Sequence, residues 1–337
     1  MLVRAMGALL LTLALVPPAI AASFDCAKAR TPFAKAICTH PDLSKADETV
    51  AKAFETARGG LSAPARAEVS AAQDGWVKFA NLACADNAKP ATRPYDADGI
   101  SCLANLFDTR TRQLQNSKML GGLRIYYVDR YAALPDPDPG NDGVKVATKA
   151  VSTPRIDGTD REAAAFNRFI ETGTGKDIDP GIADRPSPAD GSEDDTNTLI
   201  VTAVDPARIT MTLTTYMYGH GAAHGNYGIT YIHYLRDKAR RLVATDVFAT
   251  PGWQHQLQTL ALAAVKQTEG DALMLDDPSS INDSVIDPAR WDFSSAGLIL
   301  QFEPYEVAPY AAGAPAVTIP WSDLDALLAP GAQGLEG

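Results

Sequence analysis

Two histidines in a glycine-rich stretch form the pattern in this sequence most suggestive of chemistry. His220 and His224 lie in the segment Gly-His-Gly-Ala-Ala-His-Gly. On a helix, this spacing would place both imidazoles on one face, where they could hold a metal ion. Glycines surround the pair, however, and His220 is not followed by the glutamate of the zinc-protease motif. We therefore expect a hairpin loop over residues 219–226 that holds no metal, with a metal site as the alternative.

The same loop carries aromatic neighbours that suit recognition of a partner. Tyr218 precedes the two histidines and Tyr227 follows them. Tyrosines are frequent energetic anchors of protein interfaces. A glycine-rich tip is narrow enough to enter a groove on another molecule. We predict that Tyr218, His220, His224 and Tyr227 contact a partner.

A second unusual stretch runs from Pro304 to Tyr310 and reads Pro-Tyr-Glu-Val-Ala-Pro-Tyr. Its prolines fix the backbone, so we expect a shaped connection that packs on a sheet, with ligand binding as the alternative. Glu303 and Glu306 would add to an acidic face there.

Sequence motifs of common enzymes are missing. There is no Gly-x-Ser-x-Gly motif. The Gly-Thr-Gly-Lys stretch that ends at Lys176 lacks two parts of a phosphate-binding loop, because Ile170 stands at the first glycine and Asp177 replaces the following Ser or Thr. We therefore expect a binding protein with no catalytic residues and no cofactor, rather than an enzyme.

Residues 1–21 have the layout of a secretory signal peptide. Arg4 precedes an apolar run from Met6 to Val16, and small residues follow up to Ala21. The run is too short to span a bilayer stably. No lipidation pattern precedes Cys26, and no later apolar run reaches membrane length. We expect a protein without a membrane span that is periplasmic or secreted, and soluble after cleavage.

Four cysteines all fall in the first third of the chain. An even number of cysteines in an exported protein indicates a disulfide framework. Zinc binding is the rival interpretation, but no Cys-x-x-Cys pair is present. Pairing of sequence neighbours, Cys26 with Cys38 and Cys84 with Cys102, is favoured. Three connectivities remain open at this stage.

The formal net charge of the chain is -11. Removal of residues 1–21 takes away Arg4 and no acidic residue, so the charge of the exported form is about -12. A negative protein is a poor ligand for nucleic acid and attracts cationic partners. Composition therefore excludes nucleic acid and favours a basic partner.

Residue patterns divide the exported chain into two regions, a helical domain at 22–117 and an α+β domain at 118–337. In the first, apolar residues recur at steps of three and four, as on one face of a helix: Val69, Ala72, Trp76, Phe79 and Ala83. In the second, period-two alternation predicts an antiparallel sheet covered by helices. We expect strands at 123–128, 144–151, 198–204, 209–218, 227–235, 298–302 and 317–319, helices at 162–170, 253–265 and 322–328, and a polar excursion at 173–198.

The helical region resembles the LprI-type lysozyme-inhibitor domain. The residues that carry the resemblance are Phe24-Asp-Cys26, Ala34-Lys-Ala-Ile-Cys38, His40-Pro-Asp-Leu43, Asp47, Gln73-x-x-Trp76, Cys84 and Cys102-Leu103. They cover nearly all of the region and include its four cysteines. The resemblance implies a small helical domain, stapled by disulfides, that binds lysozyme.

The second region resembles the extracellular domain of RsiV-type anti-sigma factors, which is also found beside peptidoglycan-deacetylase modules. Three stretches carry the resemblance: Pro154-Arg-Ile-Asp-Gly158 with Phe166-Asn167; Tyr218 to Gly225 with Asp246-Val-Phe248; and Phe302 to Gly313 with Ile319-Pro-Trp321. The segment Gly-His-Gly-Ala-Ala-His-Gly is longer than the Gly-Gly-Ala-His form associated with that family.

Both resemblances imply the same partner. RsiV-type domains sense lysozyme by binding it, so two unrelated regions of one chain each resemble a lysozyme-binding family. The sequence thus predicts an exported cell-envelope protein that binds, and inhibits, lysozyme. The alternative is a peptidoglycan- or glycan-binding envelope module without inhibitory activity.

Overall fold

The computed structural model of this chain describes residues 22–136, 143–174, 178 and 192–335. The signal peptide expected at residues 1–21 lies outside the described residues, as does most of the polar excursion expected at 173–198.

Four helices form the first region, as the sequence predicts. Their first turns carry the expected start signals: the Thr31 hydroxyl accepts a hydrogen bond from the Ala34 amide at 3.1 Å, and Asp96 accepts one from Gly99 at 2.9 Å. The helices are α1 (Pro32–Thr39), α2 (Pro41–Arg58), α3 (Ala63–Ala83) and α4 (Ala97–Gln115), with short 3-10 turns at Cys26–Lys28 and Asp86–Ala88.

Two disulfides staple this helical region. One joins Cys26 to Cys38 and the other joins Cys84 to Cys102, with Cα atoms 5.7 Å apart in both. The second links the end of α3 to α4. The pairing favoured by the sequence is confirmed, and no cysteine is left free. Between the helices, the Trp76 ring meets Phe107 edge to face at 5.1 Å, so the predicted apolar stripe does face the core.

A seven-stranded sheet follows, with its strands in sequence order: β1 (Lys118–Leu120), β2 (Leu123–Pro135), β3 (Val146–Ile156), β4 (Glu193–Val204), β5 (Arg208–Gly219), β6 (Asn226–Leu235) and β7 (Arg240–Arg241). All neighbours are antiparallel except β3 and β4. The parallel pair needs a crossover, and helix α5 (Arg161–Gly173) lies within it. Phe166 and Ile170 of α5 pack on the sheet core.

Strand β4 starts earlier than the sequence predicts. We expected a polar excursion up to residue 198, but the strand begins at Glu193. Its polar half pairs with β5 on one side and with β3 on the other. Because main-chain pairing stabilises an inner strand independently of side-chain polarity, the hydrophobic pattern gave no sign of it.

The C-terminal part forms a small module around a three-stranded sheet with the order β10 (Ala316–Pro320), β9 (Gly297–Gln301) and β8 (Trp291–Ser294). Helices α7 (Ala244–Val247), α8 (Trp253–Glu269), α9 (Asn282–Ile286) and α10 (Trp321–Leu324) surround it. Strand β8 was not predicted. The closing helix expected at 322–328 is shorter, because a 3-10 turn, Asp325–Leu327, replaces its second half.

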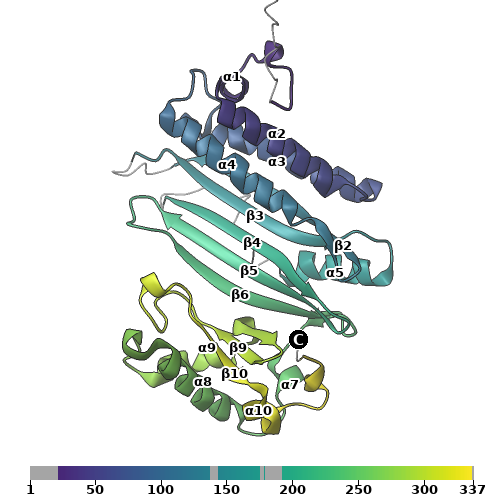
Figure 1. Cartoon of the computed structure of the whole chain (residues 1–337), viewed down its shortest axis with the longest axis vertical. Coiled ribbons are helices and arrows are strands. Elements are labelled where there is room, and N and C mark those ends of the chain that lie inside the picture. The colour runs from purple at the N-terminus through teal and green to yellow at the C-terminus, as the bar shows by residue number, and fades with distance from the viewer. Residues whose placement is uncertain (1–21, 137–142, 175–177, 179–191, 336–337) are drawn as a thin grey trace, which may run out of the picture.

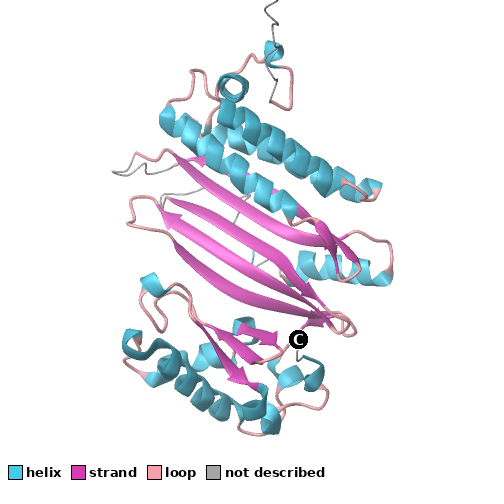
Figure 2. Ribbon diagram, in the orientation of Figure 1, coloured by secondary structure: helices cyan, strands magenta, loops and turns pink. Residues whose placement is uncertain are grey.

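The large sheet lies in the middle of the molecule, as Figure 1 shows, with α2–α4 along its β2 side and the C-terminal module along its β6 side. In Figure 2, the strands of the large sheet lie between the helices of the first region and the helices of the C-terminal module. Strand β1 pairs only with the first residues of β2, and α3 packs along the remainder. Helices therefore cover a sheet edge that would otherwise be open to pairing with other chains.

Buried polar contacts join the three parts. Arg110 of α4, fully buried, donates to Asp129 of β2 at 2.5 Å. At the other edge, the Nε2 atom of His233 lies 2.7 Å from the Trp291 carbonyl oxygen, and burial lowers the pKa of this histidine to about 4. Within the described part of the chain, no helix is both long and apolar enough to cross a membrane.

Candidate functional site

The predicted hairpin loop is present. Residues 219–226 connect β5 to β6, and Tyr216 lies directly opposite Tyr227 in the ladder. We call this loop the hairpin tip. Gly221 and His224 are exposed within it. The two histidines of the tip point to different neighbours, and each organises one side of the site.

His220 is turned inward. Its side chain is fully buried, with Nδ1 2.5 Å from an Asp136 carboxylate oxygen and Nε2 3.4 Å from an Asp194 oxygen. The Ser192 hydroxyl donates to the same Asp136 carboxylate. Burial alone would lower the pKa of His220, but the hydrogen bond to Asp136 and the charge of Asp194 outweigh it, so the pKa is raised. His220 thus fixes the base of the tip, which differs from the partner contact predicted for it.

Tyr218 packs beside this buried histidine. Its ring centroid lies 5.9 Å from that of His220, and its hydroxyl donates to the Ala222 carbonyl at 3.3 Å. The side chain is half-buried. Tyr218 therefore offers a partner less surface than the sequence suggested and mainly supports the tip from within.

His224 is turned outward and meets the C-terminal module. Its ring stacks on Tyr310 at 4.1 Å between centroids, and its Nε2 lies 3.3 Å from the Tyr305 hydroxyl. Its Nδ1 lies 2.9 Å from the Gly225 carbonyl oxygen, which also accepts from the Tyr310 hydroxyl at 2.8 Å.

Tyr227 completes a group of rings from two parts of the chain. It meets Tyr310 edge to face at 6.2 Å, and Tyr305 lies 5.3 Å from Tyr310. We call His224, Tyr227, Tyr305 and Tyr310 the aromatic cluster. The sequence predicted its first two members but treated the tyrosines after Pro304 as a structural connection.

Two backbone features show that the cluster is held in a fixed shape. Tyr305 is 52% exposed and has a φ of 69°, which is a strained conformation for a bulky residue. At Gly225, an added Cβ would lie 2.4 Å from the Tyr216 hydroxyl oxygen. The Tyr216 ring would have to move to make room for that Cβ. Strain of this kind tends to occur at binding sites, because the surrounding structure must stabilise it.

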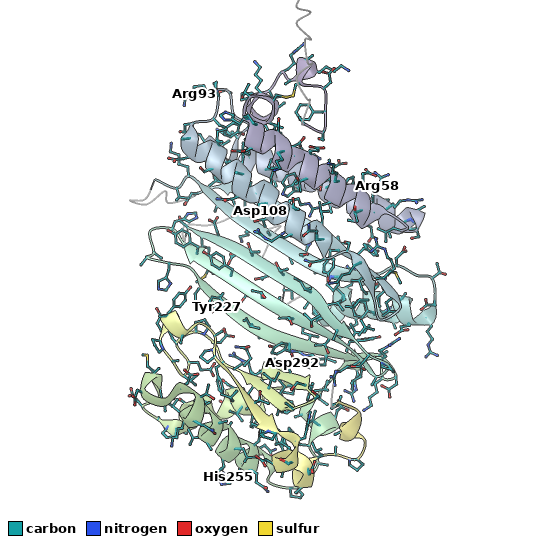
Figure 3. All side chains as sticks on the ribbon, viewed as in Figure 1. Arg58, Arg93, Asp108, Tyr227, His255 and Asp292 are labelled. Carbon is teal, nitrogen blue, oxygen red and sulfur yellow. A yellow bond between two sulfur atoms is a disulfide. The ribbon has the colours of Figure 1, made fainter. Side chains whose placement is uncertain are left out.

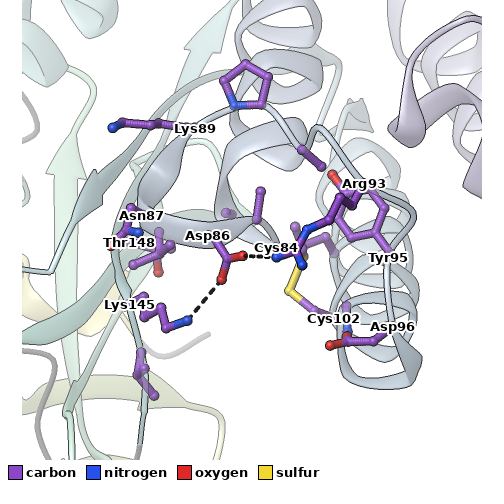
Figure 4. Close-up of a pocket in the computed structure, with 18 of the residues that line it drawn as sticks. Cys84, Asp86, Asn87, Lys89, Arg93, Tyr95, Asp96, Cys102, Lys145 and Thr148 are labelled. Atoms are coloured by element: carbon purple, nitrogen blue, oxygen red, sulfur yellow. Dashed lines mark hydrogen bonds and ion pairs between the residues drawn. A yellow bond between two sulfur atoms is a disulfide. The ribbon is translucent and has the colours of Figure 1, made fainter.

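A groove lies at the junction of the helical region and the large sheet (Figure 4). Its volume is about 1130 Å³. One wall is the connection between α3 and α4, including the Cys84–Cys102 disulfide, and the other is the start of β3. Asp86 forms ion pairs with Lys145 across the groove at 3.1 Å and with Arg93 at 3.6 Å.

The connection between α3 and α4, which forms one wall of the groove, has an unusual backbone. Asn87 and Ala88 both adopt positive φ values, 54° and 50°. A left-handed conformation costs a residue with a Cβ about 1–2 kcal/mol. Nothing in the sequence pattern signalled this groove, because its walls come from segments that are far apart in the chain.

Asp194 connects the groove to the hairpin tip. Asp194 lines the groove, and one of its oxygens accepts from both the amide and the hydroxyl of Thr148 at 2.7 Å. Its other oxygen faces His220. Among the described residues, no group of three or more His, Cys, Asp and Glu side chains is arranged to hold a metal ion.

Comparison with protein families gives two matches. Residues 26–114 match the family described as Lysozyme inhibitor LprI, and residues 245–322 match a family described as Protein of unknown function, DUF3298. The prediction that the two halves resemble separate families is therefore confirmed. The DUF3298 match includes Tyr305 and Tyr310 of the aromatic cluster, while the hairpin tip lies between the two matches.

Two solved structures are similar to part of this chain. One is a DUF3298 family protein from Pseudomonas aeruginosa PAO1, with 17% identity and a TM-score of 0.43, covering 62% of this chain and 95% of that one. The other is a member of the same family from Bacteroides fragilis NCTC 9343, with 14% identity and a TM-score of 0.46, covering 63% and 96%. No curated protein matches the chain.

Proposed function

We propose that this protein is exported, binds lysozyme and inhibits it, acting as a binding protein rather than an enzyme. The observation that carries the proposal is the match of residues 26–114 to the lysozyme-inhibitor family. The match spans the four helices and both disulfides, so it covers the whole stapled unit.

Charge supports the choice of partner. The formal net charge is -11, and lysozymes of the common animal type are strongly cationic. Opposite charge accelerates association more than it strengthens the final complex. Affinity must then come from a compact patch of anchoring side chains. The aromatic cluster fits that role, because it contains the exposed ring of Tyr305 and its Tyr310 hydroxyl donates to the Gly225 carbonyl of the tip.

The cysteine chemistry supports export. Two disulfides persist in oxidising compartments such as the periplasm or the extracellular medium. In this proposal residues 1–21 direct the chain there and are removed, which leaves a chain that starts at residue 22.

The proposal is tested by lysis of a cell-wall suspension by purified animal-type lysozyme. The chain from residue 22 is added at increasing excess, and the fall in turbidity is followed. We expect the lysis rate to drop in proportion to the lysozyme that is bound. The chain alone should release no soluble glycan fragments, and release of fragments would contradict the binding-protein assignment. An unchanged lysis rate would contradict inhibition and favour the glycan-binding alternative.

A further inference from the structure

The groove and the hairpin tip are adjacent rather than separate. Asp194 lines the groove and faces the buried His220 side chain, and Gly221, the next residue along the chain, is exposed. In Figure 3, Arg93 beside the groove and Tyr227 of the aromatic cluster both lie on the left side of the molecule, away from Arg58. The base of the tip therefore lies beside the groove.

Carboxylates gather beside the tip, whereas the groove carries charges of both signs, among them Asp86 paired with Lys145 and Arg93. Three consecutive acidic residues of β4 lie opposite the last residues of β5: Glu193 opposite Gly219, Asp194 opposite Tyr218 and Asp195 opposite Met217. Burial and the nearby charges of Glu193 and Asp194 together raise the pKa of Asp195 to about 6, against the opposing charge of Lys149. Such crowding of carboxylates makes a cationic protein the complementary partner.

The dimensions favour a folded protein over a small molecule. The groove, at about 1130 Å³, is larger than the 300–1,000 Å³ that is usual for small-ligand pockets. A standard protein interface covers roughly 800 Å² of each partner. We expect an interface of that size, centred on the tip, to include Asp194, which contacts His220 and lines the groove.

We infer that one cationic protein molecule docks on the groove and the hairpin tip at once, so that the two family-matched parts of the chain form a single composite site. The inference rests on the proposed function for the identity of that partner. The LprI-matched part supplies the α3–α4 wall, and the DUF3298-matched part supplies Tyr305 and Tyr310. One complex therefore contains one chain and one lysozyme, and contacts in both parts contribute to the same binding event.

The experiment is sedimentation velocity together with calorimetry, using the chain from residue 22 and purified animal-type lysozyme. Ala91→Trp fills the groove, and His224→Ala removes a ring from the tip. Ala67→Trp is the matched control, since Ala67 is exposed on α3 about 24 Å along the helix from its groove end. If Ala91→Trp does not fold, as judged by circular dichroism, then Thr92→Trp replaces it, because Thr92 is exposed in the same loop.

We expect one lysozyme per chain. Each of the groove and tip substitutions should weaken that single event by roughly tenfold or more, as is usual for anchoring positions, and the control should leave it unchanged. Two lysozymes per chain would overturn the inference while leaving the proposed function in place. So would a groove substitution without effect beside a tip substitution that abolishes binding. Absence of any complex would instead refute the proposed function, and the composite site with it.

Discussion

The ion pair between Arg110 and Asp129 provides a direct test of how the helical region and the sheet are held together. The two side chains are 0% and 4% exposed. Arg110 also donates through Nε to Gln73 at 2.9 Å and through Nη1 to the Tyr131 hydroxyl at 2.9 Å. One helical side chain thus connects α3, α4 and β2 through a charge that water does not reach.

Replacement of Arg110 by methionine keeps an apolar stem but leaves the Asp129 carboxylate buried without its partner. The Oδ1 atom of Asp129 already lacks a hydrogen-bond partner. Removal of Arg110 therefore leaves the buried carboxylate with few hydrogen bonds to offset its loss of hydration. Breaking a buried pair in this way costs about 3–5 kcal/mol. For a chain of this size, that corresponds to a fall in Tm of roughly 5–8 °C. Urea unfolding, followed by tryptophan fluorescence and by circular dichroism, measures the change.

The matched control is the double substitution Arg110→Met with Asp129→Leu. It removes both charges, so we expect it to recover most of the lost stability. Both probes should report one shared transition, because the helices cover the β2 edge of the sheet. A loss below about 1 kcal/mol in the single variant would refute this reasoning. A separate early transition of the helices alone would also refute it.

Three further predictions concern the tip and the staples. Gly225→Ala places a Cβ against Tyr216 and should weaken lysozyme inhibition severalfold, whereas Gly219→Ala, with open space around its Cβ, should not; equal inhibition by both variants would contradict the role of the fixed tip shape. Mass spectrometry after alkylation of the folded chain should find no free thiol, and reduction should cost about 2–4 kcal/mol per disulfide; an alkylated cysteine in the native protein would contradict this. The raised pKa of His220 means that its pairing with Asp136 and Asp194 stabilises the fold fully below the unfolded pKa of about 6.5, and that this contribution is lost as the pH rises through the folded pKa. The stability gap between the native chain and His220→Asn, measured by urea titration, should therefore be larger at acidic pH than at alkaline pH, and a gap that grows with pH would reverse the sign of the argument.

Local patterns in the sequence predicted those elements whose residues are close together in the chain. The stripe through Trp76 and Phe79 predicted α3, and the alternation through Met211 and Leu213 predicted β5. Neighbouring cysteines predicted both disulfides. In each case, the residues that carry the information lie within one short segment of the chain.

Features built from distant segments could not be predicted in this way. His220 is buried because Asp136 and Asp194 converge on it, and neither residue is near it in sequence. His224 stacks on Tyr310 across the boundary between the large sheet and the C-terminal module. A glycine-rich loop with two histidines indicated a special site, but only the fold shows that one histidine holds the loop and the other faces outward.

The most direct test of the central claim is binding of purified animal-type lysozyme to the chain from residue 22 in the absence of any cell wall. A biosensor measures association and dissociation as the salt concentration is raised. We predict binding with an association rate that falls by roughly tenfold or more with added salt, and a dissociation rate that changes little. No binding at low ionic strength, together with sedimentation of the protein with cell-wall material, would contradict the account and favour a glycan-binding module.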